Sequence, residues 1–376
     1  MSGIYIHIPY CKKQCSYCSF HFSISQKDKV EMLKCINLEL EMRQTYLKSK
    51  EVNTIYFGGG TPSILSKSEI KCILDSISNS YKIKENAEIT LECNPDDLTK
   101  DKLKALKEVG INRLSIGVQS FDDEDLKFMN RSHNATQSEN CLKLAQQVGF
   151  NNITIDLIYG LPNQNLADWE ENLKKMFAFN IPHFSAYALT VENKTPLKYL
   201  VEQKKITPLN EGKVLEQFDT LMGMAAENGF VHYEISNFAR RGKFSKHNTA
   251  YWQSKHYLGI GPSAHSYNGK SRSWNVSSNK EYIQKMIIGE DYFETEVLTK
   301  NQQYNEYIFT SLRTIWGVNS ETINVKFGIK FQNHFLKEVK KWESKKDIKK
   351  TEYTYTLTNS GKFLADAIAS DLFIVD

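Results

Sequence analysis

The sequence contains no long apolar run. None of its stretches approaches the roughly 18 consecutive apolar residues that a membrane-spanning helix needs. The start of the chain also lacks the basic and then apolar pattern of a secretory signal. We therefore predict a cytoplasmic protein with no integral membrane segment, whose contacts with a membrane would be peripheral.

A surplus of charge of one sign is missing as well. The 48 lysine and arginine residues are balanced by 44 aspartate and glutamate residues, which leaves a net charge of +4. The densest basic run, residues 340–350, also contains acidic side chains. This pattern is typical of a solvated face and not of a stripe that binds nucleic acid. We therefore predict no nucleic-acid partner.

An even set of cysteines is also absent. Seven cysteines in 376 residues do not suit a disulfide framework, which needs pairs. Four of them stand singly, and we expect these to be small buried apolar residues: Cys35, Cys72, Cys93 and Cys141. The other three lie within eight residues: Cys11, Cys15 and Cys18.

The three clustered cysteines have the spacing C-x3-C-x2-C. Such a triplet can bind three irons of a cubane cluster and leave the fourth iron open to an exchangeable ligand. A zinc site with His21 as the fourth ligand is the alternative, and the spacing alone does not exclude it. The triplet therefore predicts a metal centre.

Apolar β-rich runs alternate with amphipathic stretches up to about residue 190. This alternation predicts an α/β domain with a parallel sheet. Six strand-helix units describe a barrel or a large part of one, with a doubly wound sheet as the alternative. The predicted strands are residues 3–8, 53–58, 88–92, 113–118, 152–157 and 183–189, and the predicted helices are residues 26–48, 67–79, 99–109, 136–148 and 167–178.

The pattern changes beyond about residue 235, where the sequence becomes loop-rich and then lysine-rich and helical. We place a domain boundary near residue 290. The predicted parts are the barrel at residues 1–235, a connecting region at 236–290, and a small, mainly helical domain at 291–376.

Polar and glycine-rich residues follow several of the predicted strands. The cysteine triplet follows the first strand, and G-G-G-T-P-S follows the second. Later strands end on or near Glu92, Gln119 and Asp156, which could hydrogen-bond a ribose or an amino-acid group. Because the C-terminal ends of barrel strands meet at one rim, we expect all of these residues around one site.

Together these residues resemble the radical S-adenosylmethionine (SAM) superfamily. Its signature is matched by the three cysteines, with the aromatic Tyr17 directly before the last one. Segments such as Y-I-H-I-P-Y-C, F-G-G-G-T-P-S and D-L-I-Y-G-L-P resemble the branch of oxygen-independent coproporphyrinogen III oxidase (HemN) and the haem chaperone HemW. The resemblance spans nearly the whole chain. It implies a partial (β/α)6 barrel, similar to a TIM barrel, with a C-terminal HemN-type domain.

The resemblance also implies cofactors and the residues that hold them. A 4Fe–4S cluster would bind the three cysteines, and SAM would bind its open iron. Tyr5 and Tyr17 would pack around SAM, and Gly59, Gly60 and Thr61 would meet its amino group. Four polar residues would surround SAM: Glu92, Gln119, Arg131 and Asp156. Ala188 would lie near the adenine.

Three features bear on the choice between oxidase and chaperone. HemN has a fourth cysteine two residues after the third, where this sequence has Phe20, and a long extension ahead of its cluster, whereas Cys11 here is near the start. The segment H-N-T-A-Y-W at residues 247–252 resembles a HemW motif. We therefore expect a haem chaperone that delivers haem to client haemoproteins. Coproporphyrinogen III oxidase, or another radical SAM enzyme, is the alternative.

The resemblance makes His247 an axial ligand of haem iron, with Tyr251 and Trp252 as flat apolar surface for the porphyrin. His256 and His265 are rival ligands in the same region. We expect three other histidines to be structural residues that satisfy backbone groups: His7, His133 and His183.

Overall fold

Seven parallel strands form the centre of a twelve-stranded sheet in the computed structural model, which describes residues 2–375. They are arranged in the order β9-β1-β2-β3-β4-β5-β6. Their bounds are β1 (Ser2–Ile8), β2 (Glu51–Gly59), β3 (Lys82–Cys93), β4 (Arg113–Gln119), β5 (Ile153–Tyr159), β6 (His183–Ala188) and β9 (His256–Ile260). Because the strands are parallel, their C-terminal ends form one edge, which we call the rim.

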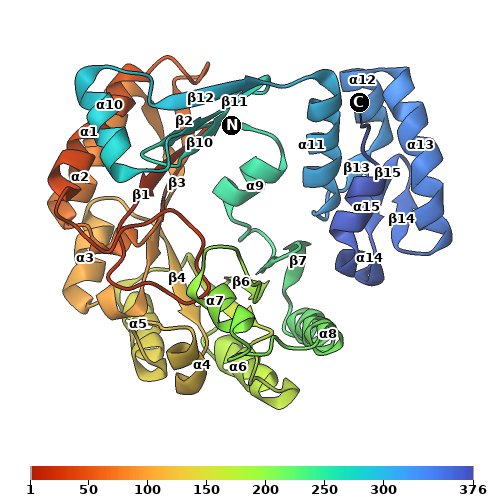
Figure 1. Ribbon diagram of the computed structural model, residues 1–376, viewed down its shortest axis with the longest axis horizontal. Helices are drawn as coiled ribbons and strands as arrows, with labels where there is room; N and C mark the ends of the chain where they lie inside the picture. Colours follow the sequence, from red (N-terminus) through yellow and green to blue (C-terminus); the bar gives the residue numbers. More distant parts are fainter. Residues whose placement is uncertain (1, 376) are drawn as a thin grey trace.

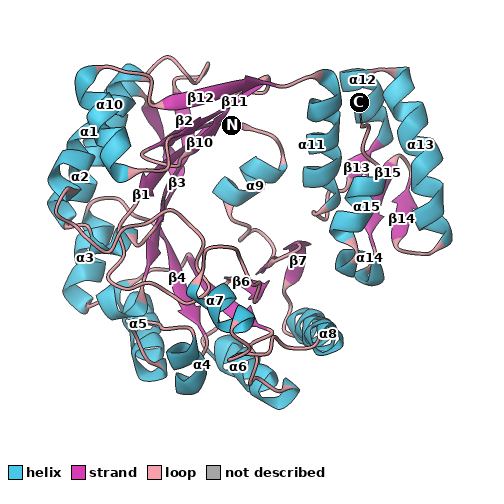
Figure 2. Ribbon diagram, viewed as in Figure 1, coloured by secondary structure: helices cyan, strands magenta, loops and turns pink. Residues whose placement is uncertain are grey.

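Antiparallel strands stand at both margins of this sheet, so the barrel does not close on itself. Beyond β9 lie β10 (His265–Tyr267), β11 (Ser271–Asn275) and β12 (Phe293–Val297). Beyond β6 lie β8 (Asn237–Ala239) and β7 (Val231–Glu234). The interior of the barrel is therefore open on one side (Figure 2).

Helices cover the outer face of the sheet (Figure 1). They are α1 (Lys29–Met42), α2 (Lys67–Ser80), α3 (Lys100–Glu108), α4 (Asp123–Phe128), α5 (Ala135–Val148), α6 (Leu166–Ala178) and α8 (Glu211–Glu227). Helix α7 (Pro196–Glu202) instead lies against the loop after β1, where the Leu197 amide donates to the Ser16 carbonyl. Strands β1, β2 and β5 are buried along nearly their whole length, and the parallel strands share one apolar core with α1, α2, α3, α5, α6 and α8. The predicted α/β partial barrel is confirmed.

Local sequence signals set several helix ends. The Ser66 hydroxyl accepts a hydrogen bond from the Glu69 amide at 3.2 Å, and the Glu69 carboxylate accepts one from the Ser66 amide at 2.7 Å. This capping box begins α2 where the sequence predicts it. By contrast, α1 ends at Met42 and not near residue 48, because the chain then turns and Arg43 packs toward Ser273 of β11.

Residues 236–290 are more regular than the sequence indicates. They contribute β8, β9, β10 and β11 to the sheet, together with α9 (Lys246–Trp252) and α10 (Asn279–Ile288). Strand pairing explains the discrepancy, because these short strands gain their stability from neighbours far away in the sequence. Residues 259–265, G-I-G-P-S-A-H, contain the turn between β9 and β10.

A second apolar core lies beyond the sheet, in the segment from Tyr304 to Leu372. It is built by α11 (Lys300–Leu312), α12 (Ser320–Phe327), α13 (Ile329–Ser344), α14 (Asn359–Phe363) and α15 (Ala365–Asp371) around a small sheet of β13 (Val318–Asn319), β15 (Thr354–Leu357) and β14 (Ile348–Thr351). Since β12 still belongs to the large sheet, this part begins near residue 300, slightly after the predicted boundary.

The four single cysteines divide into two groups. Cys35, Cys93 and Cys141 are buried, as predicted. Cys72 is exposed, and the prediction for it was wrong, because its position on α2 faces away from the core. No helix within residues 2–375 has the length and apolar character that crossing a membrane requires.

The buried Glu39 fastens the antiparallel margin to α1. Its carboxylate accepts hydrogen bonds from the Gly261 amide at 2.8 Å, the Asn275 amide group at 2.8 Å and the Tyr282 hydroxyl at 2.6 Å. A buried carboxylate is tolerated when its oxygens are satisfied in this way. Glu39 therefore fixes the turn after β9, the end of β11 and helix α10 against one helix of the barrel.

Candidate functional site

The three clustered cysteines lie in the loop after β1, at the rim, and each is half-buried. Main-chain hydrogen bonds fix the loop at two points. The Cys11 amide donates to the Ser23 carbonyl at 3.0 Å, and the Ser16 amide donates to the Met129 carbonyl at 3.0 Å. The loop is therefore held against the segment that follows β4.

Two of the thiol sulfurs accept hydrogen bonds from neighbouring loops. The Thr61 hydroxyl lies 3.3 Å from the Cys11 sulfur, and Nη1 of Arg131 lies 3.1 Å from the Cys15 sulfur. Burial raises the pKa of the Cys11 thiol to about 11. Donors aimed at sulfur stabilise a thiolate, which is the form that binds a metal.

Arg131 contacts three other parts of the rim, namely the cysteine loop, the end of β3 and β4. Its Nη2 donates to the Asn94 side chain at 2.8 Å and to the Gly117 carbonyl at 2.9 Å, while Nη1 reaches Cys15 and the Tyr17 hydroxyl, the latter at 3.5 Å. Its Nε atom is buried without a hydrogen-bond partner within the described chain. A planar guanidinium can make such divergent contacts, which an ammonium cannot.

The glycine turn after β2 packs directly on the β1 segment. Gly59 has φ +105°, and a Cβ there would lie 2.6 Å from the His7 ring. A Cβ on Gly60 would lie 2.6 Å from the Tyr10 carbonyl oxygen. Only glycine allows this approach, which brings Thr61 beside the cysteine loop.

Glu92, at the end of β3, stands over this turn. Its carboxylate accepts a hydrogen bond from the Tyr56 hydroxyl at 2.8 Å and one from the Gly59 amide at 3.2 Å. Burial raises the pKa of Glu92 to about 7, with a further contribution from nearby Asp156. A cation at this position would favour the ionised form.

The other predicted SAM residues follow along the same rim. Tyr5 stacks on Tyr56 with ring centroids 6.1 Å apart, and Gln119 ends β4 with φ +67°. Asp156 accepts a long hydrogen bond of 3.5 Å from Ser115, and burial raises the pKa of its carboxyl. Ala188 ends β6, which lies three strands along the sheet from β3, the strand that carries Glu92.

The H-N-T-A-Y-W motif forms α9, which lies inside the open barrel and away from the cysteine loop (Figure 1). His247 is only 1% exposed. One of its ring nitrogens bonds to the Thr54 hydroxyl at 2.8 Å and the other to the Tyr251 hydroxyl at 2.7 Å, and its ring stacks on Tyr56. This arrangement leaves no free ring nitrogen for iron.

Trp252 lies at the other end of the motif and is half-buried. The guanidinium of Arg313, from the segment after α11, lies 5.8 Å from its ring centroid. The histidine of the motif therefore faces the barrel interior, while the tryptophan faces the C-terminal part of the chain.

Four other histidines are held by hydrogen bonds. His7 bonds to the His21 carbonyl at 2.9 Å and His133 to the Val118 carbonyl at 3.1 Å, as predicted, whereas His183 bonds to side-chain hydroxyls. The His21 ring itself bonds to Asn279 at 2.7 Å. Among residues 2–375, no three His, Cys, Asp or Glu side chains lie close enough to hold a single metal ion, whereas in a cubane cluster each cysteine binds a separate iron.

Comparison with known proteins places these features in a family. Residues 5–176 match the model of the radical SAM superfamily. The chain is 36% identical to heme chaperone HemW of Bacillus subtilis over 98% of both chains, and 31% identical to that of Lactococcus lactis over 100% of this chain and 98% of the relative. The chain belongs to the radical SAM superfamily, in the branch of HemW and HemN. The solved structure of HemN from Escherichia coli shares the fold, with a TM-score of 0.85 and 23% identity over 99% of this chain and 90% of the other.

Membership of the radical SAM superfamily implies a 4Fe–4S cluster and SAM, and the donor set fits both. Three half-buried thiols sit at one rim, two of them with hydrogen-bond donors already aimed at sulfur. When bound, the cluster supplies an open iron and an electron for the chemistry of SAM. The protein contributes a fixed loop, the buried guanidinium of Arg131 and the carboxyl of Glu92.

Two residues of the candidate site were not predicted from the sequence. Asn94 follows Glu92 by two positions and orients Arg131, so a closer inspection of the strand ends could have identified it. Tyr56 lies within β2 and touches Tyr5, Glu92 and His247. Only the alternation of side chains along β2, which puts Tyr56 on the face of Gly58, hints at this role.

We predict that Glu92→Gln changes how the stability of the metal-free protein depends on pH. Because the folded-state pKa of Glu92 is raised to about 7, its protonated form stabilises the fold fully below the unfolded-state pKa, and this contribution is lost as pH rises through 7. Glu92→Gln should therefore melt like wild type at low pH and a few degrees higher above pH 7. The exposed Glu171→Gln is the control; equal melting of all three proteins at high pH would contradict the assignment.

We also predict that Arg131→Gln loses iron on anaerobic reconstitution. The variant cannot donate to Cys15, Asn94 and the Gly117 carbonyl together, so the loop is less ordered. Iron and sulfide should fall clearly below the roughly four atoms of each per chain in a complete cluster. Arg131→Lys should be intermediate, and the exposed Arg241→Gln should match wild type. Full iron content in a folded Arg131→Gln variant would rule out this role.

Proposed function

We propose that this protein is a haem chaperone that binds haem together with a 4Fe–4S cluster and SAM, and that it delivers haem to client haemoproteins in the cytoplasm. The observation that carries the proposal is the match over 98% of both chains to a protein named as a heme chaperone. The H-N-T-A-Y-W segment on α9 supports it, since this motif resembles that of HemW.

Phe20 supports the chaperone role over coproporphyrinogen III oxidase chemistry. It stands two residues after Cys18, where the resemblance to the oxidase implies a fourth cysteine. Its side chain is 73% exposed and offers neither a thiol nor a polar group beside the proposed cluster. The likeness to the solved HemN structure concerns the fold alone, because the identity is 23%.

The contacts of α9 favour a haem surface at its C-terminal end. Tyr251 and Trp252 are half-buried, and Trp252 faces the segment after α11. Coordination of iron by His247 would require one of its two hydrogen bonds to break and the iron to reach a side chain that is only 1% exposed. The flat apolar area of the tryptophan is available without such a change.

Haem added to purified protein should give a saturable Soret band, both with and without the reconstituted cluster. Incubation of the reconstituted protein with SAM, a reductant and coproporphyrinogen III should give no protoporphyrinogen. Absorbance spectroscopy and anaerobic product analysis check the two outcomes. Formation of protoporphyrinogen would contradict the chaperone assignment, and so would haem binding no tighter than that of an unrelated protein.

His247→Ala should destabilise the protein and keep the Soret band. The substitution leaves the Thr54 and Tyr251 hydroxyls without their buried partner, which costs about 2–3 kcal/mol in the free energy of unfolding. His265→Ala, at an exposed position, should change neither property. Urea unfolding and haem titration measure both. Loss of the band with unchanged stability would instead identify His247 as an iron ligand.

A further inference from the structure

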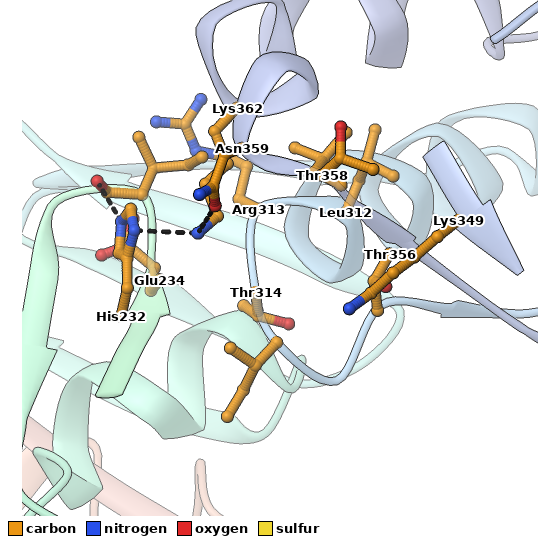
Figure 3. A pocket seen from close by; sticks show the side chains of 13 residues that line it. His232, Glu234, Leu312, Arg313, Thr314, Lys349, Thr356, Thr358, Asn359 and Lys362 are labelled. Carbon is orange, nitrogen blue, oxygen red and sulfur yellow. Dashed lines mark hydrogen bonds between the residues drawn. The ribbon is translucent and has the colours of Figure 1, made fainter. Parts of the chain in front are cut away.

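A cavity of about 350 Å³ lies between the barrel and the C-terminal part of the chain (Figure 3). One wall comes from β7 and the residues after it, and the opposite wall from β14, β15 and α14. Ile235, Leu312, Ile315 and Leu357 supply apolar lining. Three cationic side chains also line it: Arg313, Lys349 and Lys362.

Lys362 is the best-fixed of these cations. Its ammonium group donates to Nδ1 of His232 at 2.9 Å and to the Asn359 side chain at 3.4 Å, and the other nitrogen of His232 bonds to the Ile235 carbonyl at 2.9 Å. Burial and the nearby charge of Lys349 lower the pKa of Lys362 to about 8. Within residues 2–375, no carboxylate forms an ion pair with Lys362.

The acidic groups around the cavity do not neutralise it. The carboxylate of Glu234 is turned to Asn237 at 2.5 Å and to the Ser236 amide at 3.4 Å, and burial raises its pKa. Asp366 pairs with Arg313. Lys349 and Lys362 therefore leave uncompensated positive charge in a concave, partly apolar site, which favours an anionic ligand.

Arg313, which lines the cavity, also contacts aromatic side chains of α9 and α11. The guanidinium of Arg313 lies 5.8 Å from the Trp252 ring and 5.2 Å from the Phe309 ring. Phe309 is 36% exposed, and Trp316, which follows the cavity residue Ile315, is 37% exposed. Exposed aromatic area beside a cationic pocket suits a flat, apolar ligand with anionic groups on one edge.

We propose that this cavity binds the propionate carboxylates of haem through Lys362 and Lys349, with the macrocycle lying outside against the aromatic side chains near Trp252. The proposal rests on the proposed function, and it adds the place and the chemistry of haem recognition. A cavity of about 350 Å³ holds carboxylate arms and is too small for a whole tetrapyrrole. Lys362, fixed by His232 and Asn359, is ready to donate to a carboxylate at little further cost in side-chain entropy.

The test compares haem with its dimethyl ester, which keeps the iron and the ring and lacks the carboxylates. Wild type should bind haem about tenfold more tightly than the ester. Lys362→Gln, and Lys349→Gln to a smaller extent, should weaken the binding of haem and leave the binding of the ester unchanged. Lys350→Gln is the matched control, because Lys350 is the next residue on β14 and lies over the Tyr355 ring, away from the cavity.

Unchanged binding of the ester also shows that a variant is folded. If Lys362→Gln does not fold, Lys349→Gln still tests the proposal, because Lys349 is exposed. Succinate should compete with haem and not with the ester. Equal haem affinity in wild type and both cavity variants overturns the proposal while the proposed function stands. If succinate protects Lys362 from an acylating reagent and haem affinity is equal in all variants, the cavity is instead a site for free carboxylates. If wild type binds neither haem nor the ester, the proposed function itself fails, and this proposal with it.

Discussion

The barrel is incomplete, and helix α9 covers part of its interior. Glu88 of β3 accepts hydrogen bonds from the Lys246 and His247 amides at 3.2 and 3.0 Å, which satisfies the free amides at the start of the helix. His247 then bonds to the Thr54 hydroxyl of β2. The helix is therefore fastened to two adjacent strands by polar contacts that would be costly to leave unmade inside the barrel.

This closure connects distant parts of the chain. On one side, His247 stacks on Tyr56 with ring centroids 5.0 Å apart. The Tyr56 hydroxyl donates a hydrogen bond to the Glu92 carboxylate, which also accepts one from the Gly59 amide. On the other side, Trp252 meets Arg313, which belongs to the C-terminal part. One helix thus contacts both the residues behind the proposed SAM site and the wall of the cationic cavity. The H-N-T-A-Y-W motif therefore links the surroundings of the two proposed sites through the contacts of His247 and Trp252.

The sequence is informative where a local rule determines the structure. Parallel strands put their ends at one rim, so the cysteine loop, Gly59 and Glu92 could be brought together from strand order alone. The partners of His247 could not be predicted in this way, because Thr54 and Glu88 come from strands more than 150 positions away. The same holds for β9, whose pairing with β1 depends on a contact of similar separation. Long-range pairing of short segments leaves little trace in composition or periodicity.

The two ends of the barrel interior differ in how they respond to protons. Burial, reinforced by the charge of Arg113, lowers the pKa of His247 to about 3, so its ring stays neutral and can bond to two hydroxyls at once. Arg113 also helps to keep the buried His183 neutral. Glu92, with a pKa raised to about 7, is the group that changes charge near neutral pH. His247 therefore stays neutral near pH 7, whereas Glu92 can gain a negative charge when a cation binds at the rim, which would suit the proposed sulfonium ligand.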